Sequence, residues 1–473
     1  MTENREKFNS RLGFILAAAG SAVGIGNLVG FPVNATKNGG GAFLVIYVLF
    51  IIFICLPVMI AEMSVGRHTE KNPLGAYKKM TNNNPFWRIG GWLSIITPFM
   101  IAVFYQVITV WILGYFLMTV SGNLNQLASP DYFGAFINGN AVFMYCALLF
   151  VIVGAVLNGG VQQGIERLAK VLMPTLIIML VMLVLFVLTL DNAMLGVKFY
   201  LIPDFGKVTP AVVSNALNQA FFSLSLGMGI LITYGSYVSR KESIANGAKL
   251  VALTDTSVAF FAGLLILPAI FAFNPATNTE ELSSSSVSLV FTFLPKIFLS
   301  LEASIGYLGA SIFASLFFLA VFFAALTSQV SITQVPLAAL QDELAYSRTK
   351  SVLVLGLLLV LLVLACTVSF GRVPFFTEFT SYGGGVKSLF DVVYDIFYDT
   401  ILPLNGFIIC LFVGWRWRLA NMNQELVDGD MVYQGSFYQN YVNFALRYVI
   451  PVVLLIVFID TVAQKLTGSS LLY

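Results

Sequence analysis

Charge, histidine and cysteine are all scarce in this sequence, and each scarcity excludes a class of protein. Only 10% of the 473 residues are charged, against about 25% in a typical soluble domain, so an ordinary soluble protein is excluded. The single histidine, His68, lies among charged residues and no paired acids support hydrolysis, so we expect no enzyme. The four cysteines fall in apolar stretches without metal-site spacing, which predicts buried thiols at positions 55, 146, 366 and 410.

A concentrated basic face is also absent. The net charge is +2, and the basic residues are dispersed through short connections, which excludes a nucleic-acid partner. What the sequence does have is apolar length, with 58% hydrophobic residues and many runs near the roughly 20 residues needed to cross a bilayer. We predict one integral membrane domain over residues 1–473, with eleven spans near 12–33, 41–66, 89–120, 141–157, 167–190, 211–237, 245–273, 308–340, 351–370, 388–414 and 441–463.

The distribution of Lys and Arg predicts the orientation. Eighteen of the 25 basic residues lie in the N-terminus and the even-numbered connections, and seven lie in the odd-numbered connections and the C-terminus. By the positive-inside rule the N-terminus is cytoplasmic, and an odd number of spans leaves the C-terminus outside. We therefore expect a multi-pass protein of the cell membrane. The longest outer connection contains an apolar stretch at 286–301, which is either a short lid helix or a loop packed on the outer surface.

Two spans contain weak points in the helix. Gly20, Gly24 and Gly26 lie near the middle of span 1, and a glycine in a helix interior costs roughly 1 kcal/mol. Span 6 carries SLSLGMG at 223–229. Interruptions at corresponding places in two groups of five spans indicate an inverted-repeat transporter with its site at mid-membrane. The alternative for span 1 is that its glycines form a small-residue packing face.

Five motifs carry a resemblance to a known family. They are GSAVGIGN with FP at 20–32, NGGGAF at 38–43, Glu62 with the GR pair ending span 2, NQAFFSLSLGMG at 218–229, and ALTSQ with DEL at 325–344. Over nearly the whole chain the sequence resembles the neurotransmitter:sodium symporters, and within them the bacterial amino-acid transporters of the leucine-transporter fold. The resemblance implies an all-α membrane protein with a 5+5 inverted repeat, broken helices 1 and 6, and one extra C-terminal helix. The repeats would cover about 11–190 and 211–414, and the extra span about 441–463.

The resemblance implies a sodium-coupled symporter that imports neutral hydrophobic L-amino acids, bulky aliphatic or aromatic, by alternating access. Half-helix N-termini offer amides to the substrate carboxylate, and the C-terminal ends offer carbonyls to cations. The pocket predicted by resemblance contains no buried charge, which favours apolar side chains. The implied substrate contacts are Ala22, Ile25, Gly26, Ile101, Tyr105, Phe222, Ser223, Ser225, Met228, Ser328 and Ile332.

Two sodium ions are expected from the same resemblance, because a hard cation prefers oxygen ligands. The first site would use the Ala22 carbonyl, Asn27, Ser223, a polar residue of span 7 and the substrate carboxylate. Span 7 offers Thr254 and Asp255, and we favour Asp255, since an ionisable residue at that depth is functional by default. The second site would use the carbonyls of Gly20, Val23 and Ala324 with the hydroxyls of Thr327 and Ser328. The alternative for both hydroxyls is a bond within their own helix.

A carboxylate in span 7 also predicts transport that does not depend on chloride. The inner gate implied by resemblance is Arg5 with Asp342, and the outer lid is Tyr105 with Phe222. Members of the family usually have Arg before Phe-Pro, whereas this chain has Gly30. Three aspartates of span 10 lie one turn apart on one face; we expect them to be solvated and give them no gate role. They are Asp391, Asp395 and Asp399.

Two other functions remain open on the same fold. One is a non-transporting amino-acid sensor, which sequence does not separate from a transporter. The other is an ion-conducting channel, although no TVGYG-like filter segment is present in the sequence. The sequence makes no prediction about the oligomer.

Overall fold

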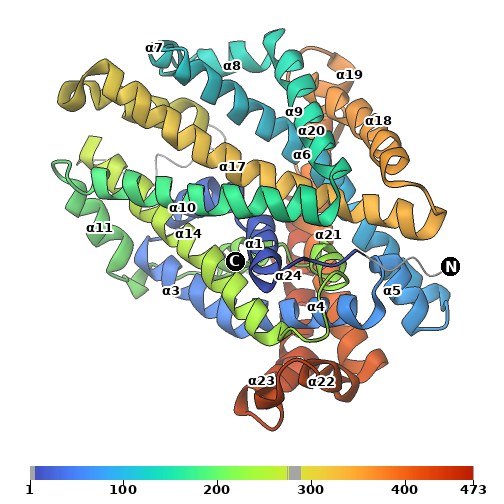
Figure 1. Cartoon of the computed structure of the whole chain (residues 1–473). Helices are drawn as coiled ribbons and strands as arrows, with labels where there is room; N and C mark the ends of the chain where they lie inside the picture. Colours follow the sequence, from blue (N-terminus) through green and yellow to red (C-terminus); the bar gives the residue numbers. More distant parts are fainter. Residues whose placement is uncertain (1–5, 274, 276–288, 472–473) are drawn as a thin grey trace.

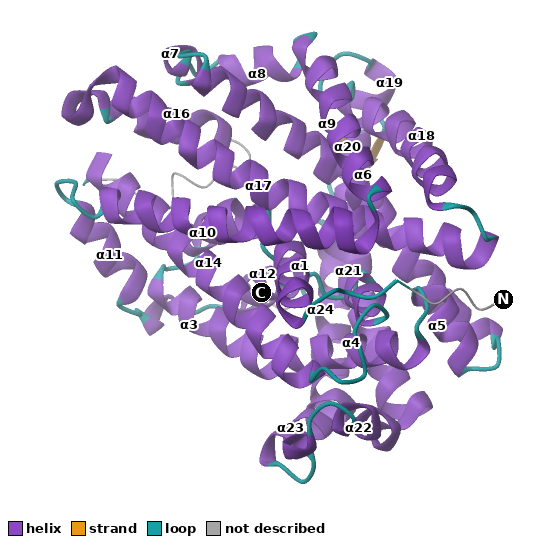
Figure 2. Ribbon diagram, in the orientation of Figure 1, coloured by secondary structure: helices purple, strands orange, loops and turns teal. Residues whose placement is uncertain are grey.

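Helices form almost all of the chain in the computed structural model, which describes residues 6–273, 275 and 289–471 (Figures 1 and 2). Among these residues a pair of short strands, β1 (Thr380–Tyr382) and β2 (Gly385–Lys387), forms an antiparallel hairpin, with Thr380 opposite Lys387. The four cysteines are buried and free, as predicted. The observed secondary structure confirms the all-helical prediction.

The helices of the N-terminal half follow the predicted spans closely. Several contain a π-helical stretch, labelled η, within a longer helix. In chain order they are α1 (Arg11–Ala22), η1 (Gly26–Gly30), α2 (Phe31–Lys37), α3 (Gly41–Phe50), η2 (Ile51–Cys55), α4 (Leu56–Thr69), α5 (Pro73–Met80), α6 (Pro85–Val120), α7 (Leu124–Leu127), α8 (Tyr132–Ile137), α9 (Ala141–Asn158), η3 (Val161–Glu166), α10 (Arg167–Val187) and α11 (Ala193–Leu201).

The C-terminal half contains two single turns of 3-10 helix, η4 and η9, besides further π-helical stretches. Its elements are η4 (Phe205–Lys207), α12 (Pro210–Ser223), α13 (Ile230–Gly235), α14 (Ile244–Phe273), η6 (Leu289–Phe293), α16 (Leu294–Ser300), α17 (Glu302–Leu344), α18 (Arg348–Thr367), α19 (Pro374–Thr377), α20 (Leu389–Val393), η7 (Tyr394–Thr400), α21 (Ile401–Leu411), η8 (Phe412–Arg418), α22 (Leu419–Val427), η9 (Met431–Tyr433), α23 (Phe437–Phe444), η10 (Ala445–Val449) and α24 (Ile450–Thr467).

Nine helices among the described residues are long and apolar enough to cross a membrane, and the bent pair Arg11–Ala22 with Gly26–Lys37 makes a tenth. Span 10 is helical from Leu389 to Arg418, four residues beyond the predicted end at 414, and positive φ at Arg418 separates it from α22. The longest helix, α17, has non-helical backbone at Gly306, which agrees with the predicted start of span 8 at 308. The lengths of these helices agree with the membrane character predicted from composition.

Both predicted interruptions are present. In span 1 the helix stops at Ala22, Val23 is extended, and the two halves meet at 51°. In span 6, α12 ends at Ser223 and α13 starts at Ile230, and three residues between them have positive φ: Ser225, Gly227 and Gly229. Such backbone leaves carbonyl and amide groups outside the helical ladder, so these groups are available to ligands.

The long helices α6 and α17 pack against each other through the middle of the molecule, and α1 contacts α10, α14 and α17. Figure 1 shows α17 crossing the view beside α10. Glycine allows a closer contact between α4 and α13. A Cβ at Gly66 would lie 1.9 Å from the Ile232 carbonyl oxygen, and one at Gly235 would lie 2.4 Å from the Met63 carbonyl oxygen. Small residues permit this backbone approach between membrane helices.

The apolar stretch at 286–301 forms helix from residue 289 onward. η6 and α16 pack against each other and α16 packs on α17, with Leu294, Ile297 and Phe298 buried. The helix alternative is therefore correct and the loop alternative is wrong for residues 289–301, while residues 286–288 lie outside the described residues. The short helix is held in place because its apolar face packs on the bundle.

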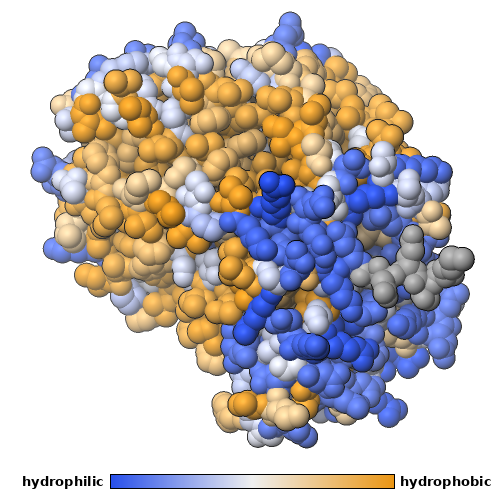
Figure 3. Space-filling view, in the orientation of Figure 1, coloured by the Kyte–Doolittle hydropathy of each residue, from blue (hydrophilic) through white to orange (hydrophobic). Residues whose placement is uncertain are grey.

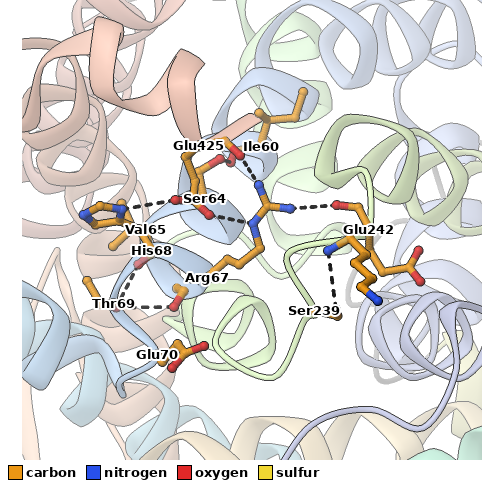
Figure 4. Close-up of polar contacts among 12 residues, drawn as sticks. Ile60, Ser64, Val65, Arg67, His68, Thr69, Glu70, Ser239, Glu242 and Glu425 are labelled. Carbon is orange, nitrogen blue, oxygen red and sulfur yellow. Dashed lines mark hydrogen bonds and ion pairs between the residues drawn. The ribbon is translucent and has the colours of Figure 1, made fainter. Parts of the chain in front are cut away.

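The surface divides into an apolar and a hydrophilic region. Figure 3 shows a broad hydrophobic surface over α10, α14 and α17, and a hydrophilic region where Figure 1 places α4, α5 and α22. Inside the hydrophilic end, Arg67 of α4 is fully buried and its Nε donates to Glu425 Oε1 of α22 at 2.7 Å. Its Nη1 donates to the Glu242 carbonyl at 2.7 Å, and Nη2 donates to the Glu425 carbonyl (Figure 4). One guanidinium thus ties together α4, α22 and the loop before α14.

Candidate substrate and sodium site

An aromatic cavity of about 480 Å³ reaches the interruption in span 1. Ile25 and Gly26 of the interrupted segment line it together with Tyr105 of α6 and Phe222 of α12. Its walls include further aromatic side chains: Phe104, Phe291, Phe390, Tyr394 and Tyr398. We call this space the aromatic cavity. Four of the predicted substrate contacts therefore meet at one accessible place.

Tyr105 contacts the broken backbone of span 1 directly. The Ile25 amide donates to the Tyr105 hydroxyl oxygen at 3.1 Å. A Cβ at Gly24 would lie 2.5 Å from that hydroxyl and 2.7 Å from Ser328 Oγ. Since real Cβ atoms do not approach this closely, glycine is required at 24 by the contacts of the interrupted segment. These contacts, and not the packing of one uninterrupted helix on another, explain the glycine at position 24.

The other predicted substrate contacts are buried and do not line the aromatic cavity. Ser225 donates its hydroxyl to the Ser21 carbonyl at 3.1 Å, which joins the two interrupted segments. Met228 is 1% exposed and Ile332 3% exposed. The buried members are Ala22, Ile101, Ser223, Ser225, Met228, Ser328 and Ile332.

Asp255 of α14 lies in a buried polar cluster beside the interruption of span 1. The Asn27 amide donates to Asp255 Oδ1 at 2.7 Å and to Ser223 Oγ at 2.9 Å. Ser223 donates to Asp255 Oδ2 at 2.9 Å, and Tyr47 donates to Ser223 at 3.2 Å. Asn27, Ser223 and Asp255 are each at most 1% exposed. Burying a carboxylate among neutral donors is unfavourable unless a cation or a proton balances it.

The neighbouring residue Thr254 is excluded from this cluster. Its side chain is partly buried and its hydroxyl donates to the Leu250 carbonyl of the same helix at 2.8 Å. The structure therefore places Asp255, the residue favoured from the sequence, against Asn27, whereas the Thr254 hydroxyl bonds within α14.

A second group of oxygens surrounds Ser328 of α17. Its Oγ lies 3.0 Å from the Val23 carbonyl oxygen, 3.1 Å from that of Ser21 and 3.4 Å from that of Gly20. A hydroxyl carries one hydrogen, so it cannot satisfy three acceptors, and the surplus oxygens suit a hard cation. Thr327 bonds within its own helix, to the carbonyls of Phe323 and Ala324 at 3.1 and 3.0 Å. Thr327 thus bonds within its own helix, whereas the Ser328 hydroxyl faces the carbonyls of span 1.

Sequence reasoning assigned no role to three side chains that hold the interrupted segments in place. Gln219 of α12 donates to the Gly26 carbonyl at 2.8 Å and accepts from Asn34 at 2.9 Å. Glu62 accepts from the Gly227 amide at 2.8 Å, and Asn405 donates to the Gly227 carbonyl at 2.9 Å. The sequence feature that could have revealed two of them is a polar residue within an apolar helix, which describes both Gln219 and Asn405.

The structure describes both residues of the predicted outer lid but only one residue of the predicted inner gate. Asp342 accepts from the backbone and side-chain amides of Asn72 at 2.8 and 3.0 Å. Its predicted partner, Arg5, lies outside the described residues, so that pair stays a prediction. On the other side, Phe222 and Tyr105 both line the aromatic cavity.

The expectation for the aspartates of span 10 is wrong in part. Asp391 is exposed and caps α20 by accepting from Ser388. Asp395 is buried and paired with Lys465 of α24 at 2.5 Å, and Asp399 is paired with the same lysine at 2.5 Å. The sequence spacing placed the three on one face, but it did not reveal that the terminal helix covers two of them.

Interrupted helices with buried oxygen clusters beside each break, set in a bundle of apolar helices, define a membrane transporter of ions and small solutes. Residues 5–130 and 137–471 match the model of the sodium:neurotransmitter symporter family. This chain belongs to that family and is a sodium-dependent symporter. The family consists of transporters.

Relatives cover the chain almost completely. An uncharacterized sodium-dependent transporter, YhdH, from Bacillus subtilis is 34% identical over 96% of this chain and 97% of its own length. One from Haemophilus influenzae is 32% identical over 97% of this chain and 99% of its own. The crystal structure of MhsT in complex with L-phenylalanine superimposes with a TM-score of 0.84 at 37% identity, covering 96% of this chain and 99% of that one.

Proposed function

We propose that this protein imports neutral hydrophobic L-amino acids, bulky aliphatic or aromatic, together with two sodium ions, independently of chloride. The observation that carries the proposal is Asp255, a fully buried carboxylate bonded to Asn27 beside the break in span 1. A buried negative charge there attracts a cation and replaces the charge that an anion would otherwise supply. The MhsT structure, which holds L-phenylalanine, supports the class of substrate.

The substrate binds between the two interrupted segments. Its carboxylate faces the amides of the half-helix that starts near Ile25 and Gly26, with the Tyr105 hydroxyl beside them, because half-helix N-termini favour anions. Its ammonium faces the carbonyls at the end of α12, near Phe222 and Ser223. The side chain enters the apolar surroundings of Ile101, Met228 and Ile332, where no charge is required to be buried.

Sodium couples to the substrate through shared ligands. The first ion binds to oxygens of Ala22, Asn27, Ser223 and Asp255 and to the substrate carboxylate. The second binds to the carbonyls of Gly20, Val23 and Ala324 and to the hydroxyls of Thr327 and Ser328. An ion that contacts the substrate raises the affinity for it, and the substrate raises the affinity for the ion by the same factor.

The architecture that performs the exchange is a single domain of eleven spans. Spans 1–5 and 6–10 form inverted repeats, and α24 belongs to the extra span. The N-terminus lies in the cytoplasm and the C-terminus outside. Tyr105 and Phe222 close the outer side of the site, and Arg5 with Asp342 closes the inner side. Exposed ion pairs are weak, about 0–1 kcal/mol, which suits a gate that opens in every cycle.

Uptake into proteoliposomes tests the proposal. Labelled phenylalanine, tryptophan, leucine, alanine and glutamate are offered with an inward sodium gradient, with choline in place of sodium, and with gluconate in place of chloride. We expect accumulation of the first three that requires sodium and persists in gluconate. Strong glutamate uptake contradicts the apolar pocket, and loss of uptake in gluconate contradicts chloride independence. Binding without accumulation identifies a sensor, and flux without substrate identifies a channel.

A further inference from the structure

A partly buried charge cluster joins α24 to span 10. Lys465 Nζ of α24 lies 2.5 Å from Asp395 Oδ1 and 2.5 Å from Asp399 Oδ2 of η7. The Asp395 side chain is 9% exposed, and it also accepts from the Tyr382 hydroxyl at 2.8 Å. Lys387 Nζ lies 3.8 Å from its second oxygen. Charged hydrogen bonds in such a shielded place hold geometry more firmly than exposed pairs do.

The hairpin of β1 and β2 fixes the same end of α24. Gly383 lies in its turn with φ +59°, and a Cβ there would be 2.6 Å from the Lys465 carbonyl oxygen. Tyr382 and Lys387, which both contact Asp395, stand in the two strands of this hairpin. The end of α24, the hairpin and η7 therefore form one connected unit.

This unit borders the aromatic cavity, because Asp395 itself lines it. Asp395 directly follows Tyr394, and Asp399 directly follows Tyr398. Both tyrosines line the cavity and stack on each other with ring centres 4.5 Å apart. The Tyr398 ring meets the Phe222 ring edge-on at 4.3 Å. The segment that carries them, η7, is π-helical over seven residues, and such widened turns are frequent at functional sites.

We infer that Lys465 is a positioning residue of the outer lid: by holding Asp395 and Asp399, it sets η7 so that Tyr398 packs against Phe222. The inference rests on the proposed function, because Phe222 closes over the substrate only if the site binds one. It also assigns a role to the span outside the two repeats. Position 30, before Phe-Pro in span 1, carries glycine and offers no cation to span 10, whereas the terminal helix supplies one.

The test compares Lys465→Met with the unsubstituted protein in sodium-driven uptake of labelled L-phenylalanine. If the lid is closed for a smaller fraction of the time, the apparent affinity for the substrate falls by the same factor. We therefore expect KM to rise roughly tenfold, while maximal uptake changes less than about twofold. Lys465→Arg keeps the charge and is expected to restore KM to within about twofold. Lys207→Met is the matched control, since it also replaces a lysine by methionine. The Lys207 ammonium lies 5.9 Å from the centre of the Phe199 ring and is not part of the Lys465 cluster. An unchanged KM in Lys465→Met overturns the inference.

A second readout does not depend on uptake. Ile108 lines the aromatic cavity, and the native cysteines are buried, so Ile108→Cys reports access for a membrane-impermeant thiol reagent. In sodium alone we expect several-fold faster labelling when Lys465→Met is added, because the lid stands open more often. Equal labelling rates overturn the inference even if no substrate is transported. If the unsubstituted protein accumulates no amino acid while the labelling rates differ, the proposed function fails and the lid assignment stands.

Misfolding is separated by a variant that also removes the two carboxylate charges. Lys465→Met with Asp395→Asn and Asp399→Asn takes away one positive and two negative charges, and the charge that remains is on Lys387, whose side chain is 32% exposed. This variant is therefore expected to fold even if Lys465→Met alone does not. It still lacks the charged contacts that fix η7, and the raised KM and faster labelling are therefore expected again. A folded triple variant with the KM and labelling rate of the unsubstituted protein overturns the inference.

Discussion

The buried guanidinium of Arg67 makes a quantitative prediction about stability. Its side chain is 0% exposed and that of Glu425 is 5% exposed, with Nε and Oε1 2.7 Å apart. Removing one partner of a buried pair costs about 3–5 kcal/mol, because the other charge stays buried without compensation. Glu425→Gln keeps the shape of the side chain but removes its charge, so we expect a loss of about 3 kcal/mol, at the lower end of that range.

This free energy converts into a measurable shift in Tm. An unfolding entropy of about 2.1 cal/mol/K per residue, over 473 residues, gives roughly 1 °C for each kcal/mol. Membrane proteins in detergent keep some of their helical structure on denaturation, so the entropy is smaller and the shift larger. We therefore expect Glu425→Gln to lower Tm by at least about 3 °C in a thermal denaturation series run at one scan rate.

A neighbouring glutamate provides the control. Glu70 pairs with Lys7 at 3.2 Å, but both side chains are more than 40% exposed, and an exposed pair contributes about 0–1 kcal/mol. Glu70→Gln should therefore shift Tm by less than about 1 °C. The double variant Arg67→Met with Glu425→Leu removes both charges and should recover most of the loss. The reasoning is refuted if Glu425→Gln is no worse than Glu70→Gln, or if the double variant is worse than Glu425→Gln.

Three further predictions concern the site. Asp255→Asn should weaken sodium activation of uptake by roughly tenfold or more, since it removes the charge that favours the cation, whereas Thr254→Val, at a hydroxyl that bonds only within its own helix, should leave the sodium dependence unchanged. Gly24→Ala should abolish high-affinity substrate binding, because its Cβ would lie 2.5 Å from the Tyr105 hydroxyl; Gly154→Ala has open space around it and should bind normally in the same equilibrium assay. Ser328→Ala should raise the sodium concentration needed for half-maximal uptake several-fold without changing the preference among amino acids; a changed preference at unchanged sodium dependence would contradict the assignment.

Much of the fold could be predicted because its signals are local. Apolar runs of the length of a bilayer indicated the helices, and the glycines at 20–26 and 227–229 indicated the interruptions, since each signal lies within one short segment. Asp255 was found for the same reason, as an acid inside an apolar run. These predictions needed no knowledge of which helices touch.

The features that could not be predicted depend on contacts between distant segments. The pairing of Lys465 with Asp395 and Asp399 joins residues about 70 positions apart, and both aspartates lie in η7, a π-helical segment that the sequence did not predict. The roles of Gln219 and Asn405 likewise depend on which carbonyls the interruptions leave free. Thr327 and Ser328 are adjacent in sequence. Which hydroxyl bonds within α17 and which one faces span 1 depends on how α17 packs against span 1.

The close contact at Gly66 and Gly235 restricts how the bundle can rearrange. Each glycine faces a backbone carbonyl of the other helix, so sliding or rotation of α4 against α13 would force backbone atoms together. The two helices are therefore expected to move together. A change in angle within span 6 would then fall on residues 224–229, whose backbone is already free of the helical ladder.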